Sequence, residues 1–292
     1  MVRLTKRRLT ECMTTTAKDL GTILVLGGTG KTGRRVVSRL LDRGVEVRVG
    51  SRSATTPFDW EDSSTWRAAL AGVDAVYMSY QPDLAAPGAP ARIRQFSDLA
   101  VAQGVQRLVL LSGRGEPEAQ ECEQIVQASD VDSTIVRCSW FAQNFSEDYL
   151  VDPVRGGEVV LPAADVPEPF VDTDDIADVA VAALTEDGHV GELYELTGPR
   201  LLTFADAVAE ISTATGRDIR FIQVPVEDYA ATLVEYQVPA EVIALLTYLF
   251  STVLDGRNAY VTDGVERALG RKPRDFADFA AAAAASGIWA GE

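Results

Sequence analysis

The chain has 292 residues, and its 27 Lys and Arg against 43 Asp and Glu give a formal net charge of −16. Apolar residues make up 47 % of the sequence, which is typical of a globular protein and too high for a disordered one. Because nucleic acids and anionic membrane surfaces are bound through Lys and Arg, this charge argues against both as partners. A small-molecule substrate is expected instead, and a local basic cluster could still hold an anion.

The cysteines and the N-terminal segment bear on location. Cys12, Cys122 and Cys138 are too few and too scattered for a disulfide framework, which favours a reducing, cytoplasmic environment. The apolar runs fall short of the roughly 18–20 residues of a membrane span. Residues 1–20 start with a basic stretch that no apolar core follows. We interpret them as a flexible N-terminal extension, with a short ordered arm as the alternative.

From residue 21 onward, short apolar runs alternate with longer segments of helical spacing. Alternating strands and helices indicate βαβ units, and therefore an α/β fold with a doubly wound, mostly parallel sheet of the Rossmann type. We predict strands at residues 22–26, 45–50, 75–80, 107–112 and 133–137, and helices at residues 34–43, 65–71, 91–103 and 116–129.

After about residue 145 the alternation becomes less regular. We therefore divide the chain into a Rossmann part, residues 21–150, and a smaller α+β C-terminal lobe, residues 151–292, interleaved with the Rossmann sheet. In this second half we predict strands at residues 156–161, 191–196 and 219–224, and helices at residues 174–185, 203–216, across 227–254, 263–269 and 276–286.

A glycine-rich turn, Gly27-x-x-Gly30-x-x-Gly33, lies directly between the first predicted strand and the first predicted helix. In dinucleotide sites with this spacing, the first glycine permits a tight turn, the second admits a pyrophosphate and the third lets the helix pack on the strand. The alternative is a glycine-rich turn without a ligand. A P-loop is excluded because Lys31 lies within the glycine spacing. The other predicted cofactor contacts in this loop are Thr29, Lys31 and Thr32.

The end of the second strand bears on which dinucleotide is bound. NAD sites carry an Asp or Glu there for the ribose 2′-hydroxyl, whereas this chain continues with Ser51, Arg52 and Ser53. These residues suit a 2′-phosphate, because a guanidinium makes charge-assisted hydrogen bonds to it. We therefore predict NADP(H) in preference to NAD(H); the alternative for Arg52 is a solvated loop charge. A local positive site is expected around the turn, from Lys31, Arg34, Arg35 and Arg52.

Several passages together resemble the NmrA-like family of atypical short-chain dehydrogenases/reductases, from about residue 21 to 289. They are residues 27–34, 49–52, 58–60, 110–112, 134–137 with Phe141-x-x-Asn144-Phe145, 170–177 and 195–199. The passage from Arg52 to Trp60 is similar to the branch of the festuclavine and agroclavine dehydrogenases. That branch reduces an iminium carbon with a nicotinamide cofactor.

The resemblance implies further contacts at the carboxyl ends of the strands, where doubly wound sheets bind their ligands. They are Asp59 and Trp60 beside the adenine, Tyr80 and Gln81 along the ribose and pyrophosphate, Ser112 and Gly113 near the nicotinamide ribose, and Cys138, Ser139, Trp140 and Phe141 beside the nicotinamide ring and the substrate.

The sequence departs from the family in its catalytic residues. Catalytic short-chain dehydrogenases pair a Tyr with a Lys four residues later, and the Tyr gives up a proton. The corresponding positions here are Gly115 and Ala119, and residues 112–129 contain neither Tyr nor Lys. One interpretation is a reductase that delivers hydride to an imine or iminium, a quinone or a conjugated carbonyl of a small apolar metabolite. The other is a non-catalytic NADP(H)-sensing protein that acts through a protein partner.

The remaining candidates concern the substrate. Ser112, Tyr80 and Asn144 are expected to orient it as the catalytic candidates. The aromatic residues of the segment 229–250 have three possible roles: lining an apolar substrate pocket, packing in the ordinary core, or forming a dimer surface. With one histidine and scattered cysteines, no metal site is expected, and the chain is expected to be a monomer or a homodimer. The predicted substrate contacts are Trp140, Phe141, Asn144, Tyr229 and Tyr248.

Overall fold

The computed structural model describes residues 21–163 and 165–290, so the predicted extension at residues 1–20 lies outside the described residues. Its centre is a six-stranded sheet in the spatial order β2-β1-β3-β4-β5-β7, in which neighbouring strands are parallel. The strands are β1 (Thr22–Leu26), β2 (Glu46–Gly50), β3 (Ala75–Met78), β4 (Arg107–Gly113), β5 (Asp132–Cys138) and β7 (Leu193–Leu196).

The strand order reverses beside β1. From β1 the chain moves outward to β2, then crosses back to β3 and continues to the other edge. In open α/β sheets the ligand crevice lies at the carboxyl ends of the strands, at such a switch point. The predicted fold class, a doubly wound parallel α/β sheet, is confirmed.

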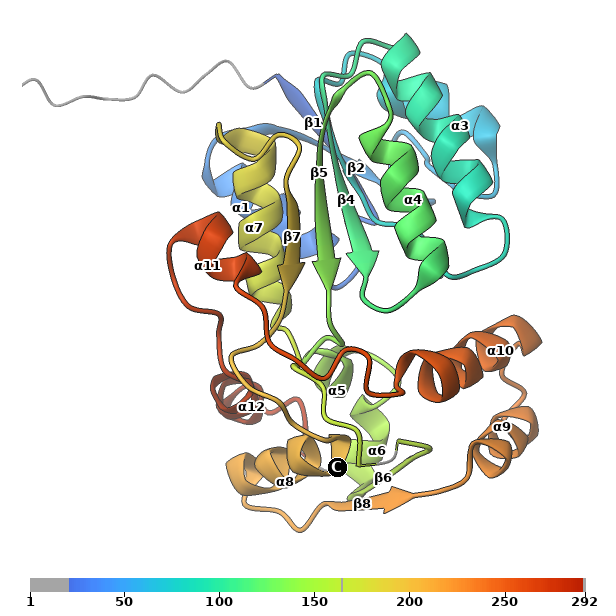
Figure 1. The fold of residues 1–292 in the computed structure, drawn as a ribbon, viewed down its shortest axis with the longest axis vertical. Helices are drawn as coiled ribbons and strands as arrows, with labels where there is room; N and C mark the ends of the chain where they lie inside the picture. Colours follow the sequence, from blue (N-terminus) through green and yellow to red (C-terminus); the bar gives the residue numbers. More distant parts are fainter. Residues whose placement is uncertain (1–20, 164, 291–292) are drawn as a thin grey trace, which may run out of the picture.

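Helices cover both faces of the sheet (Figure 1). Alternate residues of β1 point to opposite faces, so Ile23 and Val25 pack in one core cluster and Leu24 and Leu26 in the other. All four are fully buried, as expected for a central strand of a covered parallel sheet. The helices of this body are α1 (Gly33–Asp42), α2 (Trp66–Leu70) after a 3₁₀ turn (Ser63–Thr65), α3 (Ala89–Ala102), α4 (Pro117–Gln127), α7 (Thr173–Thr185) and α11 (Gly264–Leu269).

A second lobe faces the carboxyl ends of the strands (Figure 1). Its core is a cluster of Phe145, Phe170, Phe204 and Phe276, with ring centroids 5.0–5.8 Å apart. It contains the parallel pair β6 (Glu158–Leu161) and β8 (Arg220–Gln223), and α5 (Asn144–Glu147), α6 (Val151–Gly156), α8 (Phe204–Thr215), α9 (Val226–Glu235), α10 (Ala240–Tyr248) with a π-helical end (Leu249–Val253), and α12 (Phe276–Ala285).

The two bodies are interleaved along the chain. After β5 the chain enters the second lobe through α5, and it returns to the sheet as α7 and β7. It leaves again as α8 and comes back once more as α11, which packs on α7 and β7. Asp172 begins α7 by accepting a hydrogen bond from the Asp174 backbone N–H, so this carboxylate caps the helix.

The predicted elements are present, with ends shifted by up to two residues. The two short helices α5 and α6 were not predicted, because four to six residues give too little helical periodicity to detect. The strand β3 ends at Met78, so Ser79 and Tyr80 leave the sheet at its carboxyl edge. Within residues 21–163 and 165–290, no helix has both the length and the apolar content needed to cross a membrane.

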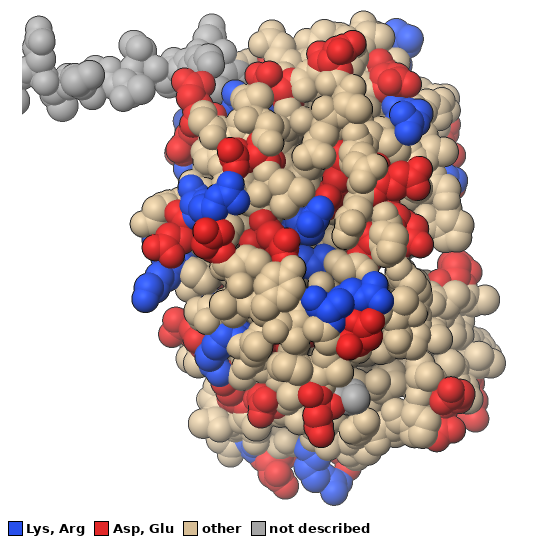
Figure 2. All heavy atoms as spheres, viewed as in Figure 1, with Lys and Arg blue, Asp and Glu red and all other residues tan. Residues whose placement is uncertain are grey.

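Acidic and basic side chains are interspersed over the face shown in Figure 2, where the blue and red groups of the described residues alternate. Ion pairs among the described residues include Arg39 with Asp178 and Arg267 with Glu192. The net charge of −16 is therefore not concentrated in one block on this face.

Candidate cofactor and substrate site

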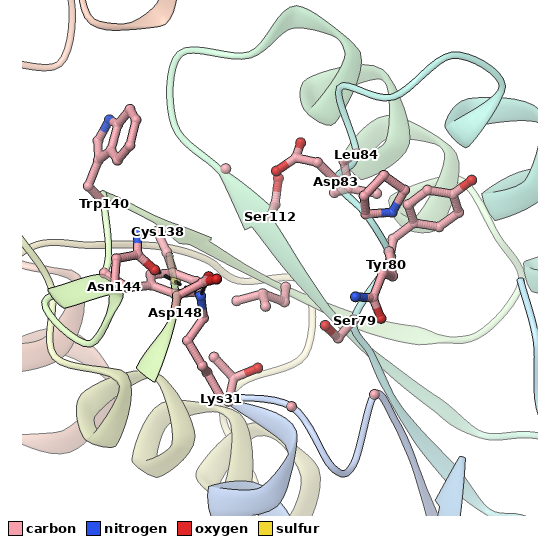
Figure 3. A pocket seen from close by; sticks show the side chains of 18 of the residues that line it. Lys31, Ser79, Tyr80, Asp83, Leu84, Ser112, Cys138, Trp140, Asn144 and Asp148 are labelled. Carbon is pink, nitrogen blue, oxygen red and sulfur yellow. Dashed lines mark hydrogen bonds and ion pairs between the residues drawn. The ribbon is translucent and has the colours of Figure 1, made fainter. Parts of the chain in front are cut away.

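A cavity of about 720 Å³ lies at the carboxyl ends of the strands, against the second lobe (Figure 3). This volume is in the range of pockets that bind small molecules and cofactors. The structure brings most of the predicted site residues together around it. Those that line the cavity are Gly27, Thr29, Gly30, Lys31, Thr32, Arg52, Tyr80, Gln81, Ser112, Gly113, Cys138, Ser139, Trp140, Phe141 and Asn144.

The glycine loop has the geometry that a bound pyrophosphate requires. Gly27 has a φ of +64°, which favours glycine. A Cβ at Gly33 would overlap the Gly27 carbonyl oxygen, so helix α1 starts in direct contact with the loop. The first turn of α1 holds no acidic residue, and the Thr32 side chain makes no capping hydrogen bond there. The backbone N–H groups of Arg34 and Arg35 already donate to the Gly30 and Thr32 carbonyl oxygens. Phosphate oxygens would therefore be held by N–H groups of the loop ahead of Arg34, and the loop fits a dinucleotide.

The basic residues around the loop correct one expectation. Lys31 donates a hydrogen bond from Nζ to Asn144 Oδ1 at 2.9 Å and forms an ion pair with Asp148 (Figure 3). Arg34 and Arg35 both form ion pairs with Glu147. Although burial opposes it, the hydrogen bonds and charges of the two arginines hold the pKa of Glu147 below its usual value. The expected positive cluster is thus largely neutralised by carboxylates of α5 and the residue after it.

Arg52 differs from these three cations. It is exposed, lines the cavity just beyond the end of β2, and makes no ion pair with a carboxylate among the described residues. Ser51 and Ser53 flank it, with their hydroxyl oxygens 3.5 Å apart, but neither residue lines the cavity. A cation without a carboxylate partner can accept a phosphate without first breaking an ion pair.

Asp59 and Trp60 lie away from the cavity lining. Trp60 is only 6 % exposed, and its Nε1 donates a hydrogen bond to the Ser79 carbonyl oxygen at 3.0 Å. Its ring packs against those of Phe58 and Tyr80, at centroid distances of 5.0 and 4.9 Å. Trp60 therefore supports the segment after β3 from inside the core.

The hydroxyl groups of Ser112 and Tyr80, two of the predicted catalytic candidates, form hydrogen bonds with other side chains of the protein. Ser112 Oγ donates to Glu123 Oε1 at 2.6 Å, so its proton is directed away from a ligand. The Tyr80 hydroxyl points away from the centre of the cavity (Figure 3) and lies 3.4 Å from Nη1 of Arg92. Burial raises the pKa of Tyr80 despite this arginine. In this conformation the Ser112 proton is directed to Glu123, and the Tyr80 hydroxyl, which accepts from Arg92, is directed away from the centre of the cavity. Both residues therefore shape the wall of the cavity.

Two carboxyl groups on the same wall were not identified from the sequence. Asp83 follows the segment after β3, and Glu116 immediately precedes α4; both line the cavity. A Cβ on Gly113 would lie 2.7 Å from Glu116 Cδ, so this carboxyl group rests directly over the end of β4. The two residues are 33 positions apart and share no local motif, so only the fold brings them together.

Arg114 is a second residue that the sequence did not single out. It is 3 % exposed, and its Nε donates to Glu195 Oε1 at 2.7 Å. Its Nη1 donates to Ser139 Oγ at 2.9 Å and to the Asn258 carbonyl oxygen at 3.2 Å. The guanidinium also stacks 4.5 Å from the ring centroid of Tyr260. Arg114 thus fixes the ends of β4, β5 and β7 to the segment before α11.

The residues after β5 form the wall nearest the second lobe. Trp140 packs against Phe204 and Phe250, with ring centroids 5.2 and 5.1 Å apart. The Lys31 ammonium lies 5.9 Å from the ring centroid of Phe141. Burial raises the pKa of the Cys138 thiol well above its usual value, which makes this side chain an unreactive packing group.

Tyr229 and Tyr248, the predicted aromatic contacts from residues 229–250, do not line the cavity. Tyr229 packs edge-on against Phe250 in the lobe core, and the Tyr248 hydroxyl donates to Glu118 Oε2 at 3.0 Å. Other residues of this region take that place, because they lie on the helix face turned to the sheet. The apolar wall is completed by Leu246, Leu249, Val253 and, from α5–α6, Tyr149.

Comparison with known proteins bears on the family. The NAD(P)H-binding family model matches residues 27–187, and the NmrA-like family model matches residues 117–280. The festuclavine dehydrogenase of Aspergillus fumigatus is 35 % identical over 285 residues, which cover 89 % of this chain and 96 % of that protein. The agroclavine dehydrogenase of Claviceps fusiformis is 32 % identical over 281 residues, which cover 88 % and 96 %.

The chain belongs to the NmrA-like family. The predicted resemblance is confirmed, and so is the expectation that the family is one of NAD(P)H-dependent oxidoreductases. An NADPH-dependent quinone oxidoreductase of Escherichia coli, solved with NADPH, has the same fold with a TM-score of 0.73 and 20 % identity, covering 89 % of this chain and 99 % of that one. Within the described residues of this NmrA-like protein, no three His, Cys, Asp or Glu side chains are placed to hold a metal ion.

Proposed function

We propose that this NmrA-like protein is an NADPH-dependent reductase of small apolar substrates that carry an imine or iminium, a quinone or a conjugated carbonyl. The observation that carries the proposal is one continuous cavity, which extends from the glycine loop at Gly27 to the apolar wall of Trp140, Leu246 and Leu249. In it, residues 21–150 would hold the dinucleotide, and residues 151–292 add Leu246, Leu249 and Val253 to the apolar wall. The bound nicotinamide supplies a hydride to the substrate carbon.

The chain's own residues support binding of NADPH. Backbone N–H groups of the glycine loop and the start of α1 would hold the pyrophosphate. Arg52 would bind the 2′-phosphate, because it is the cavity-lining Lys or Arg that has no carboxylate partner among residues 21–163 and 165–290. The strand end beside it offers no carboxylate for a ribose 2′-hydroxyl, which favours NADP(H) over NAD(H).

The substrate class follows from what the wall lacks. Gly115 has a φ of +78°, and a Cβ there would lie 2.6 Å from Asn258 Nδ2. Ala119 is fully buried inside α4. A Tyr and a Lys in these positions would fit neither the backbone nor the packing, so the usual proton donor is missing. An iminium carbon needs only hydride, which agrees with the clavine dehydrogenases among the relatives.

The proposal is tested by mixing the purified protein with NADPH and, separately, a cyclic iminium ion, a benzoquinone and a conjugated enone. Loss of the near-ultraviolet absorbance of NADPH in at least one mixture, with the reduced product identified by mass spectrometry, is the expected result. Tight binding of NADPH without turnover of any of the three would contradict the reductase. That outcome would favour the NADP(H)-sensing interpretation instead.

A further inference from the structure

One wall of the cavity holds a pair of carboxyl groups, Asp83 and Glu116, and neither forms an ion pair with a Lys or Arg among residues 21–163 and 165–290. The two side chains are hydrogen-bonded to each other. Glu116 is 7 % exposed, yet it lines the cavity beside Ser112 and Gly113 at the end of β4. Figure 3 shows Asp83 and Ser112 on the wall opposite Asn144 and Trp140, and both Asp83 and Glu116 line the space between these walls, where a substrate would lie.

The surroundings keep one proton on this pair. Burial and the neighbouring charge of Asp83 raise the pKa of Glu116 well above its usual value, and burial also raises the pKa of Asp83. Glu118 and Glu123, both on α4, add further negative charge. Two arginines lie near this loop but bind elsewhere: Arg114 donates to Glu195, and Arg257 donates to the Gly115 carbonyl oxygen. Two hydrogen-bonded carboxyl groups tend to share a proton, because the repulsion between their charges disfavours ionising both.

We propose that Glu116, hydrogen-bonded to Asp83, is the proton donor for substrates whose reduction leaves a negative charge, in place of the absent Tyr and Lys. The inference rests on the proposed function and adds the source of the proton that quinones and conjugated carbonyls need. Ser112 cannot fill this role in the observed conformation, because its proton is held by Glu123. Tyr80 cannot do so because its hydroxyl is directed toward Arg92.

The atoms and charges balance as follows. A quinone or enone accepts hydride from NADPH and is left with a negative oxygen, and NADP⁺ remains. The proton on the Glu116 carboxyl group moves to that oxygen, which gives the neutral hydroquinone or enol. The pair is then left with two negative charges until a proton from water restores it. An iminium ion becomes a neutral amine on hydride addition and takes no proton from Glu116.

This difference provides an internal control. In a Glu116→Gln variant, the amide can still donate a hydrogen bond to Asp83 but has no acidic proton to transfer. We expect kcat for the benzoquinone and the enone to fall about 100-fold or more, the usual contribution of a general acid. We expect kcat for the cyclic iminium ion to change less than about twofold. Glu121→Gln, at an exposed position of the same helix outside the cavity, is the matched control and should leave all three rates unchanged.

A pH profile adds a second kinetic test. The carboxyl pair can donate a proton only while it carries one. The rate of quinone reduction should therefore fall as the pH rises through the raised pKa of the pair. The iminium rate should lack this fall in wild-type protein. The Glu116→Gln variant should lose the same limb of the quinone profile.

Infrared spectroscopy of the protein without cofactor tests the protonation of the carboxyl pair independently of catalysis. Infrared titration of the wild-type protein should show protonated carboxyl absorbance that persists well above the pH at which ordinary Asp and Glu ionise. Glu116→Gln should lose the part that Glu116 contributes and keep the part of Glu168, whose pKa burial raises to about 7. The same absorbance in wild type and Glu116→Gln overturns the inference, and so does an equal loss of the iminium and quinone rates in Glu116→Gln. A wild-type protein that reduces the iminium ion but no quinone or enone overturns the inference alone. One that reduces none of them overturns the proposed function as well.

Discussion

Charged side chains have different partners at the two ends of the cavity. At the glycine-loop end, Lys31, Arg34 and Arg35 are paired with carboxylates of α5 and the residue after it. At the β4 end, the carboxyl groups of Asp83 and Glu116 are paired with each other. In a chain with a net charge of −16, the proposed phosphate site would therefore depend mainly on backbone N–H groups, and the proposed proton donor on a proton shared between two carboxyl groups.

The most severe way to break the glycine-loop end is Gly33→Val. Its side chain would overlap the Gly27 carbonyl oxygen and separate helix α1 from the loop. We expect affinity for NADPH and NADH to fall together by more than about 100-fold, and the free energy of unfolding to drop by about 1–3 kcal/mol. Calorimetric titration and denaturant unfolding measure these effects. Gly156→Ala, where a Cβ meets no atom within 4 Å, is the control that should change neither.

A more selective change is Arg52→Ala. Hydrogen bonds to a charged group contribute about 1.5–3 kcal/mol, so we expect affinity for NADPH to fall about 10- to 100-fold. Affinity for NADH, which lacks the 2′-phosphate, should stay within about twofold. Equal losses for the two cofactors would contradict the assignment of Arg52. Arg67→Ala, at an exposed position of α2 outside the cavity lining, serves as the control.

The smallest effect is expected from Asp148→Asn, which tests whether the ion pairs oppose phosphate binding. Removing this half-exposed carboxylate leaves Lys31 free to turn toward a phosphate. Because exposed ion pairs contribute only about 0.2–1 kcal/mol, affinity for both dinucleotides should rise about two- to fivefold at low salt. The gain should shrink as salt is added. Asp152→Asn, on the exposed surface of α6, should leave affinity unchanged; a decrease with Asp148→Asn would show that the pair supports binding.

Local patterns account for what the sequence could predict. A strand, a turn and a helix are predicted within one short segment by the buried run at residues 22–26 and the spacing of Gly27, Gly30 and Gly33. The prediction of the fold class rested on local patterns of this kind along the chain. The family resemblance was carried in the same way, by short motifs. Whether the predicted residues bind the cofactor stays a prediction.

What the sequence could not predict depends on orientation and on distant contacts. Trp60 matches a family motif, yet its ring packs on Phe58 and Tyr80 in the core. Tyr248 and Leu246 are two positions apart on one helix, so they point in different directions, and only Leu246 reaches the cavity. The direction in which a side chain points depends on how the helices and strands pack, and no motif encodes it.

The bridge from Lys31 to α5 has a practical consequence that follows from composition. Lysine occurs only four times in the 292 residues, and the other one among the described residues is the distant Lys272. The remaining basic residues are arginines, which amine-directed reagents leave untouched. The degree of acylation at Lys31, read by peptide mapping, would therefore report directly whether the phosphate end of the cavity is occupied. Lys31 would thus serve as a chemical footprinting probe at the position where the glycine loop meets Asn144 and Asp148.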